Sequence, residues 1–107
     1  MELKQYSVVL VNLDPTIGSE IKKTRPCVIL SPNEINKFLK TIVVAPMTTN
    51  LKKYPTRVNI KHNGKNGMIA VDQIRTIDKT QILKRFDRLT KSEIANCKSI
   101  MKETFVD

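Results

Sequence analysis

The stretch Pro26-Cys27-Val28-Ile29-Leu30 is a continuous apolar run, bounded by Arg25 and Ser31. A short run without alternation is typical of a strand that is buried on both faces. Residues 41–46 are β-branched and apolar, and they predict a second central strand. Residues 6–13 alternate imperfectly and are rich in valine, which predicts a third strand. These segments indicate a β-rich domain.

Shorter strands are predicted further along the chain. Residues 57–60 alternate as an outer strand does, and residues 68–74 and 85–89 predict two more short strands. Residues 63–67 have the composition of a turn. The polar segments 14–25 and 48–55 are predicted to be loops.

Two sequence signals predict helices. Ser31-Pro32-Asn33-Glu34 offers a cap, a proline in the first turn and a glutamate that closes a capping box, so a short helix should end near Phe38 or Leu39. Thr90-Lys91-Ser92-Glu93 is a second capping box, and the apolar residues behind it follow helical spacing. These residues are Ile94, Cys97, Ile100, Met101 and Phe105. The terminal helix should lay this stripe across the sheet.

The length and composition of the chain limit its class. With 107 residues and 40 % apolar content, we expect a single domain over 1–107 with one modest core. No apolar run reaches the roughly 18–20 residues that span a bilayer, and the first residues lack the apolar centre of a signal peptide, so we expect a cytoplasmic protein with no membrane partner. Cys27 and Cys97 lie in apolar segments and are predicted to be buried thiols rather than a disulfide. Two cysteines and one histidine make a poor zinc site, and we expect no metal and no cofactor.

The positive charge is concentrated in one part of the sequence. The net charge is +9, and the segment from residue 22 to residue 65 contains ten basic residues against one acid, Glu34. That segment alone therefore accounts for the whole excess. Such a field attracts polyanions. A lysine-rich, solvated surface is the alternative interpretation of the same residues.

A series of short motifs follows one order and spacing. They are Leu13-Asp14-Pro15-Thr16, Gly18-Ser19-Glu20, Arg25-Pro26, Leu30-Ser31-Pro32, Pro46 with Thr48, Lys53-Tyr54-Pro55 and Asp72-Gln73-Ile74-Arg75-Thr76-Ile77-Asp78. The set resembles the MazF/PemK family, the endoribonuclease toxins of type II toxin–antitoxin systems. The resemblance implies a mainly β fold with appended helices, of the α+β class. The expected architecture is the SH3-like small barrel of the MazF/PemK/CcdB type with a C-terminal helix.

The residues that could perform catalysis are few. His62 is the only histidine, so two-imidazole ribonuclease chemistry is excluded within a single chain, and we expect His62 to be a solvated loop residue. RNA can also be cleaved without a metal when a guanidinium stabilises charge on the phosphate and a hydroxyl positions it. The resemblance implies that Arg25 and Thr48 fill these catalytic roles, with Glu20 orienting the arginine. Without the resemblance, each residue has an alternative interpretation. Arg25 would be a surface arginine, Thr48 an ordinary threonine at a strand end, and Glu20 an intramolecular salt-bridge partner.

A further set of residues is expected to bind RNA. It comprises Ser19, Thr49, Lys52, Lys53, Asp72 and Gln73. The lysines would neutralise phosphates, and Asp72 with Gln73 would read base edges, although these two could instead stabilise their own strand. Arg75 could have a structural role, because the alternation around Ile74 does not show which face of the strand Arg75 occupies. Some PemK-type members carry an arginine two residues before the aspartate; here Ala70 stands there, so a mechanism with Asp72 as base is not carried over.

The resemblance implies a particular function. The protein would be a metal-independent, sequence-preferring endoribonuclease that cleaves single-stranded RNA, mRNA in particular. Attack by the 2′-hydroxyl would leave a 2′,3′-cyclic phosphate and a 5′-hydroxyl. The implied partners are single-stranded RNA, a cognate acidic antitoxin and a second copy of the chain in a homodimer. Since one fold serves several functions, a gyrase-poison-like toxin and a catalytically dead RNA-binding relative remain as alternatives.

Overall fold

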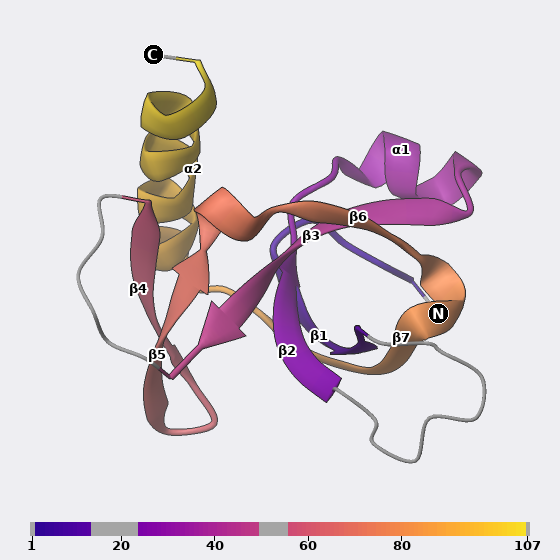
Figure 1. The fold of residues 1–107 in the computed structure, drawn as a ribbon, viewed down its shortest axis with the longest axis horizontal. Helices are drawn as coiled ribbons and strands as arrows, with labels where there is room; N and C mark the ends of the chain where they lie inside the picture. The colour runs from indigo at the N-terminus through magenta and orange to yellow at the C-terminus, as the bar shows by residue number, and fades with distance from the viewer. Residues whose placement is uncertain (1, 14–23, 50–55, 107) are drawn as a thin grey trace.

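The computed structural model describes residues 2–13, 24–49 and 56–106. Within these residues the strands are β1 (Ser7–Asn12), β2 (Thr24–Ile29), β3 (Thr41–Thr48), β4 (Arg57–His62), β5 (Lys65–Ala70), β6 (Arg75–Asp78) and β7 (Ile82–Arg88). The helices are α1 (Asn33–Phe38) and α2 (Lys91–Phe105), and two short 3₁₀ turns are η1 (Val71–Gln73) and η2 (Lys79–Gln81). The mainly β architecture with a C-terminal helix is as predicted (Figure 1).

Strand β3 is the centre of the sheet. The strand order is β4-β5-β3-β2-β1-β7, and β6 pairs with β3 beside that path. One edge of β3 pairs with β2, while the other edge pairs first with β6 and then, at Met47 and Thr48, with β5. Figure 1 shows β1, β2, β3, β6 and β7 curled into an open half-barrel, with β4, β5 and α2 to one side.

Two apolar clusters fill the two faces of the central strands. The first cluster contains Val28, Ala45, Ile69 and Cys97, among others, and lies between the sheet and α2. The second cluster consists of Val9, Val11, Cys27, Ile29, Ile42, Val44 and Ile77. Successive residues of β2 and β3 contribute to opposite clusters, as the pleat of a strand requires. Both faces are buried, which explains why residues 26–30 read as a continuous apolar run.

The capping box predicted for the terminal helix is confirmed. The Thr90 hydroxyl accepts the Glu93 N–H at 3.2 Å, and the Thr90 N–H donates to Glu93 Oε1 at 2.9 Å. The second oxygen of Glu93 accepts the backbone N–H of Lys61 at 2.8 Å, which ties the start of α2 to β4. Cys97 is fully buried, whereas Phe105 is 53 % exposed, so the predicted apolar stripe is covered over its first turns only.

Other sequence predictions were wrong in detail. Pro32, not Ser31, is the N-cap of α1, and no side chain caps it. The Ser31 hydroxyl instead donates to Asn36 Oδ1 and accepts the Val43 N–H, because it is buried against the sheet. The strand predicted over 68–74 ends at Ala70, where the chain turns through η1 into β6. That turn lets two short strands share one edge of β3.

Cys27 and Cys97 are free and fully buried, as predicted. Burial raises the pKa of the Cys27 thiol to about 12 and that of the Cys97 thiol to about 11. Neither α1 nor α2, the helices of the described residues, has the length and apolar character that spanning a bilayer demands.

The Glu93 carboxylate gives a prediction for stability against pH. Partial burial acts to raise its pKa, but hydrogen bonds from the Thr90 and Lys61 backbones outweigh that effect and hold the pKa below its ordinary value of 4.5. Its contribution is therefore present above pH 4.5 and is lost as the pH falls through the lower folded-state pKa. Glu93→Gln should lower the free energy of unfolding by about 1 kcal/mol at neutral pH and by less in acid.

Urea unfolding of the wild type and the variant between neutral and acid pH measures this difference. Glu103→Gln, an exposed change on the same helix, is the matched control and should leave the free energy of unfolding unchanged. If the difference in the free energy of unfolding between the wild type and Glu93→Gln stays constant with pH, the ionised Glu93 carboxylate does not contribute to stability as proposed.

Candidate functional site

Arg25 and Thr48 lie at the same end of the β2–β3 ladder. The last paired residues at this end are Cys27 and Pro46, and Arg25 and Thr48 each stand two residues beyond them. A continued register would set Arg25 opposite Thr48. Because side chains alternate along a strand, Arg25 shares the face of Cys27 and Thr48 shares the face of Pro46. The two candidates thus belong to one face at one end of the sheet.

The environment of this end changes from buried to exposed. Cys27 and Pro46 are buried, whereas Arg25 is exposed and Thr48 is partly exposed. Thr48 therefore ends a buried strand at a rim, as its position in the sequence predicted. A guanidinium on such a rim is anchored by a rigid ladder and is still open to a ligand.

A hollow of about 250 Å³ opens beside Thr48. It is lined by Pro26, Met47, Thr48, Thr49, His62, Asn63, Lys65, Asn66, Gly67 and Phe86. The hairpin β4–β5 comes close to β3 here, because Met68 pairs with Thr48 and a Cβ at position 67 would stand 3.2 Å from the Thr48 carbonyl oxygen. Glycine at position 67 permits this approach. The hollow combines apolar walls with a few polar groups, which is the usual character of a small ligand pocket.

His62 is placed differently from the sequence prediction. It is the last residue of β4 and partly buried, not a solvated loop residue. Its ring meets the Phe86 ring edge-on, with centroids 4.9 Å apart at 73°, and the Lys84 Nζ lies 5.2 Å from the Phe86 centroid. His62 and Phe86 therefore form an aromatic wall of the hollow. Aromatic walls suit the stacking of a base.

Asp72 and Gln73 lie in η1 and are exposed. The Asp72 carboxylate accepts the Thr56 hydroxyl at 2.9 Å, and Arg57 Nε lies 3.2 Å from the same oxygen. This carboxylate thus holds the start of β4 against η1. Gln73 makes no side-chain hydrogen bond to another described residue, so its amide is the more available of the two for a ligand.

The structure places part of the predicted site. Thr49 is exposed and borders the hollow directly after Thr48. Four predicted residues, Ser19, Glu20, Lys52 and Lys53, lie outside the described residues. Over the described ranges, no three His, Cys, Asp or Glu side chains are grouped so that they could hold a metal ion.

The sequence pattern does not decide which face of its strand Arg75 occupies, whereas the structure does. Arg75 pairs with Val44 at the start of β6, and Ile77, two residues later, is buried in the second cluster. Arg75 therefore shares the face of Arg25 and Cys27. The alternation of Arg75 with Ile77 would have indicated this, but the predicted strand boundaries cut the motif at residue 74.

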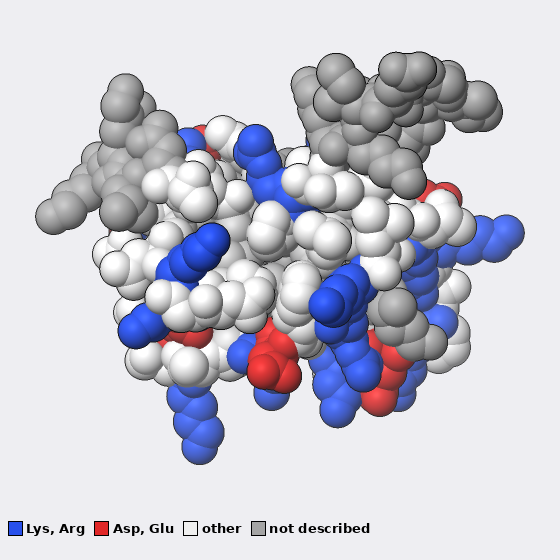
Figure 2. Space-filling model, turned by 90° about the horizontal axis from the view of Figure 1, so that it is seen from below, with Lys and Arg blue, Asp and Glu red and all other residues white. Residues whose placement is uncertain are grey.

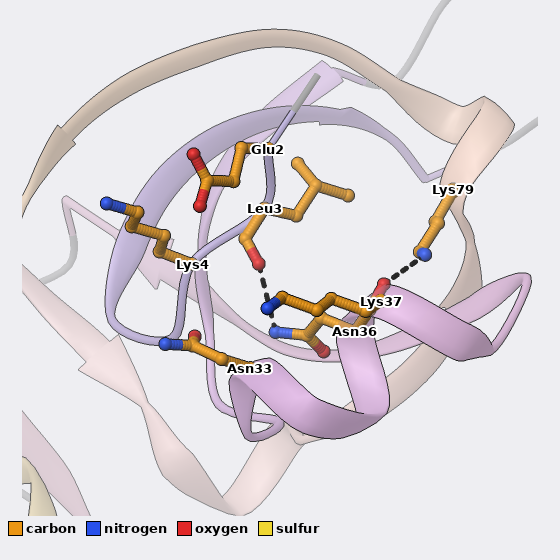
Figure 3. Close-up of a pocket in the computed structure, with 7 residues that line it drawn as sticks. All are labelled: Glu2, Leu3, Lys4, Asn33, Asn36, Lys37 and Lys79. Carbon is orange, nitrogen blue, oxygen red and sulfur yellow. Dashed lines mark hydrogen bonds between the residues drawn. The ribbon is translucent and has the colours of Figure 1, made fainter.

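A larger cavity, of about 330 Å³, lies at the opposite end of β3 (Figure 3). It is lined by Glu2, Leu3, Lys4, Asn33, Asn36, Lys37 and Lys79. Asn36 donates to the Leu3 and Ser31 carbonyls, and Lys79 donates to the Asn36 carbonyl. These polar groups are used to fix α1 to the N-terminal segment and η2. The larger size of this cavity therefore does not by itself make the cavity the functional site.

Figure 2 shows the end of the molecule where β2 begins and where the β4–β5 turn lies in Figure 1. Basic side chains project widely over this face, with a few acidic ones among them. The rim that carries Arg25 and Thr48 thus belongs to a strongly basic protein, whose net charge is +9. Such a surface favours a polyanionic ligand.

Comparison of the fold with known structures gives close matches. The MazE–MazF complex of Deinococcus radiodurans superposes with a TM-score of 0.84 at 22 % identity, over 99 % of this chain and 97 % of that chain. An endoribonuclease in complex with its cognate antitoxin from a mycobacterial species has a TM-score of 0.81 at 18 % identity, over 96 % and 94 %. The fold is thus that of the MazF toxins.

Sequence comparison gives the family itself. The model of the PemK-like, MazF-like toxins of type II toxin–antitoxin systems matches residues 4–105. Endoribonuclease MazF of Staphylococcus epidermidis is 34 % identical over 98 residues, which cover 86 % of this chain and 82 % of the relative. The Staphylococcus saprophyticus protein of the same name is 33 % identical over the same shares. The chain belongs to the PemK-like, MazF-like toxin family.

The contacts of Asp72 predict a structural contribution. Asp72→Asn should lower the free energy of unfolding by about 1 kcal/mol, because it weakens the hydrogen bond from Thr56 and removes the ion pair with Arg57. Gln73→Ala, an exposed neighbour, should change stability little. Urea unfolding of both variants, with Thr56→Val and the Thr56/Asp72 double variant, measures the coupling. A coupling of zero would show that Asp72 does not hold β4.

Proposed function

We propose that this protein is the toxin of a type II toxin–antitoxin pair and acts as an endoribonuclease on single-stranded RNA, mRNA in particular. The observation that carries the proposal is the placement of Arg25 and Thr48 on one face at one end of the β2–β3 ladder, in a chain that belongs to the PemK-like, MazF-like family. The names of its staphylococcal relatives, endoribonuclease MazF, support the same reaction.

In the proposed reaction, these residues cleave RNA without a metal ion. The ribose 2′-oxygen attacks the neighbouring phosphorus and loses its proton, the bond from phosphorus to the 5′-oxygen breaks, and that oxygen takes up a proton. The products are a 2′,3′-cyclic phosphate and a 5′-hydroxyl. Negative charge grows on the phosphoryl oxygens in the transition state, and the Arg25 guanidinium stabilises it with two N–H donors.

The remaining residues position the RNA. Thr48, at the end of a buried strand, holds the scissile phosphate against Arg25, and Glu20 orients the arginine. The hollow takes its Met47 and Phe86 walls from the first cluster, on the other face of the sheet from Arg25, so a base would pass the end of β3 to lie against Phe86 and His62 beside Thr49. Gln73 contacts a base edge, while Ser19, Lys52, Lys53 and Asp72 complete the RNA-binding set. Side-chain contacts to bases would account for a sequence preference.

The proposal includes the partners and the setting of the protein. A cognate acidic antitoxin would occupy the same basic surface, since a carboxylate-rich segment resembles a phosphate chain in charge. The mycobacterial and Deinococcus relatives of this fold were solved with an antitoxin, which supports such a complex. We further propose a homodimer that acts in the cytoplasm, in which residues 1–107 of each chain form one domain.

Cleavage of a single-stranded RNA in EDTA tests this function. Arg25→Ala should lower kcat/KM by about 100-fold to 1000-fold, because it removes the donor that stabilises the transition state. Arg25→Lys should retain part of the activity, since it keeps the charge but not the paired donors. Thr48→Ala should lower kcat/KM by about tenfold or more.

Arg88→Ala is the matched control, since Arg88 is an exposed arginine of the outer strand β7 that donates to the Gln5 carbonyl, and it should leave cleavage unchanged. Single-stranded DNA of the same sequence should stay intact because it lacks the attacking hydroxyl. Intact RNA with the wild-type protein would favour a binding protein of this fold over an endoribonuclease.

A further inference from the structure

We propose that Arg75 is a second phosphate-binding arginine of the site, which positions the RNA by holding a phosphate next to the scissile one. This inference rests on the proposed function, because it gives the same site an additional contact. Arg75 has no part in the catalytic step proposed for Arg25 and Thr48.

The register of three strands places Arg75. Ile29 of β2 pairs with Val44 of β3, and Val44 pairs on its other side with Arg75 of β6. These three residues therefore lie abreast and share one face of the sheet. Ile29 and Val44 are fully buried in the second cluster, whereas Arg75 is exposed. Arg75 thus stands at the edge where this apolar cluster meets solvent.

Arg25 stands at another edge of the same cluster, with the Cys27 thiol near both arginines. Burial raises the pKa of Cys27, and the positive charges of Arg25 and then Arg75 act in the opposite direction. Both guanidiniums are therefore close enough to act on one buried sulfur. Together they form a pair of positive charges on one rim.

No acid of the described ranges neutralises this pair. Neither guanidinium forms an ion pair or a side-chain hydrogen bond with another residue of 2–13, 24–49 or 56–106. Asp72 is engaged by Thr56 and Arg57, and Asp78 caps η2 through Thr80. As far as the described residues go, both guanidiniums are therefore open to hydrogen bonds and charge contacts from an anionic ligand.

The separation of the two residues decides which phosphate each one holds. Along β3, four residues separate the levels of Arg25 and Arg75, and two strand spacings separate them sideways. A flat sheet would then place their Cα atoms about 16 Å apart, and the curl of the sheet brings them nearer. Arg25 is level with Thr48 along β3, whereas Arg75 is level with Val44, so Arg75 suits a phosphate next to the one held beside Thr48. Arg75 therefore contributes to binding and Arg25 to the chemical step.

Steady-state cleavage of an RNA oligonucleotide separates these roles. Arg75→Ala should raise KM about tenfold and leave kcat within about twofold, because it removes one phosphate contact. Arg75→Lys should recover part of the loss, and Arg88→Ala should match the wild type. A lowered kcat at unchanged KM, or no change in either, would overturn the inference. Arg75→Gln replaces Arg75→Ala if the alanine variant does not fold.

Binding of a non-cleavable oligonucleotide keeps this test independent of catalysis. The probe is the same RNA with 2′-deoxyribose at the scissile position, and its Kd is measured by fluorescence anisotropy over a range of salt concentrations. The association constant decreases with salt, and the plot of its logarithm against log salt should be less steep by about 0.7 in Arg75→Ala. This is the change expected for one lost phosphate contact to a single strand. An unchanged slope would overturn the inference. If the wild type binds the probe and does not cleave RNA, the proposed function fails while this contact stands.

Discussion

The pairing of β2 with β3 is the interaction on which the rest of the molecule depends. It places successive residues of two central strands into two separate apolar clusters, so that each strand helps to bury both faces of the sheet. The same ladder ends where Arg25 and Thr48 project from it. The register that builds the core therefore also aligns the two residues proposed for catalysis. A slip of one residue in either strand would turn its side chain to the other face and separate the two.

The sharing of β3 between β6 and β5 gives the site its surroundings. Because β6 occupies the first half of one edge and β5 the end of it, the β4–β5 hairpin is free to fold beside Thr48. This arrangement creates the hollow with its aromatic wall, and it places Arg75 on the same face of the sheet as Arg25. The turn η1, fixed through Asp72, is what separates the two strands. A residue expected to read bases thus also has a structural task.

Charge and fold contribute differently to function. The fold is shared with MazF structures at identities near 20 %, so it is set by the pattern of apolar residues more than by particular side chains. The activity depends on a few polar groups at the ends of strands, where the apolar core stops and side chains reach solvent. In this chain those groups include the cationic Arg25 and Arg75, which suit both a phosphate chain and an acidic antitoxin.

The sequence by itself determined the central strands, the capped terminal helix, the buried thiols and the family, because these depend on local patterns and ordered motifs. It identified Arg25 and Thr48 only through the resemblance. The tertiary structure alone decided that His62 packs on Phe86, that Asp72 is held by Thr56 and Arg57, and that Arg75 shares a face of the sheet with Arg25. Each of these contacts joins residues of different elements. Strand pairing and register decide such contacts, and neither can be read from a single stretch of sequence.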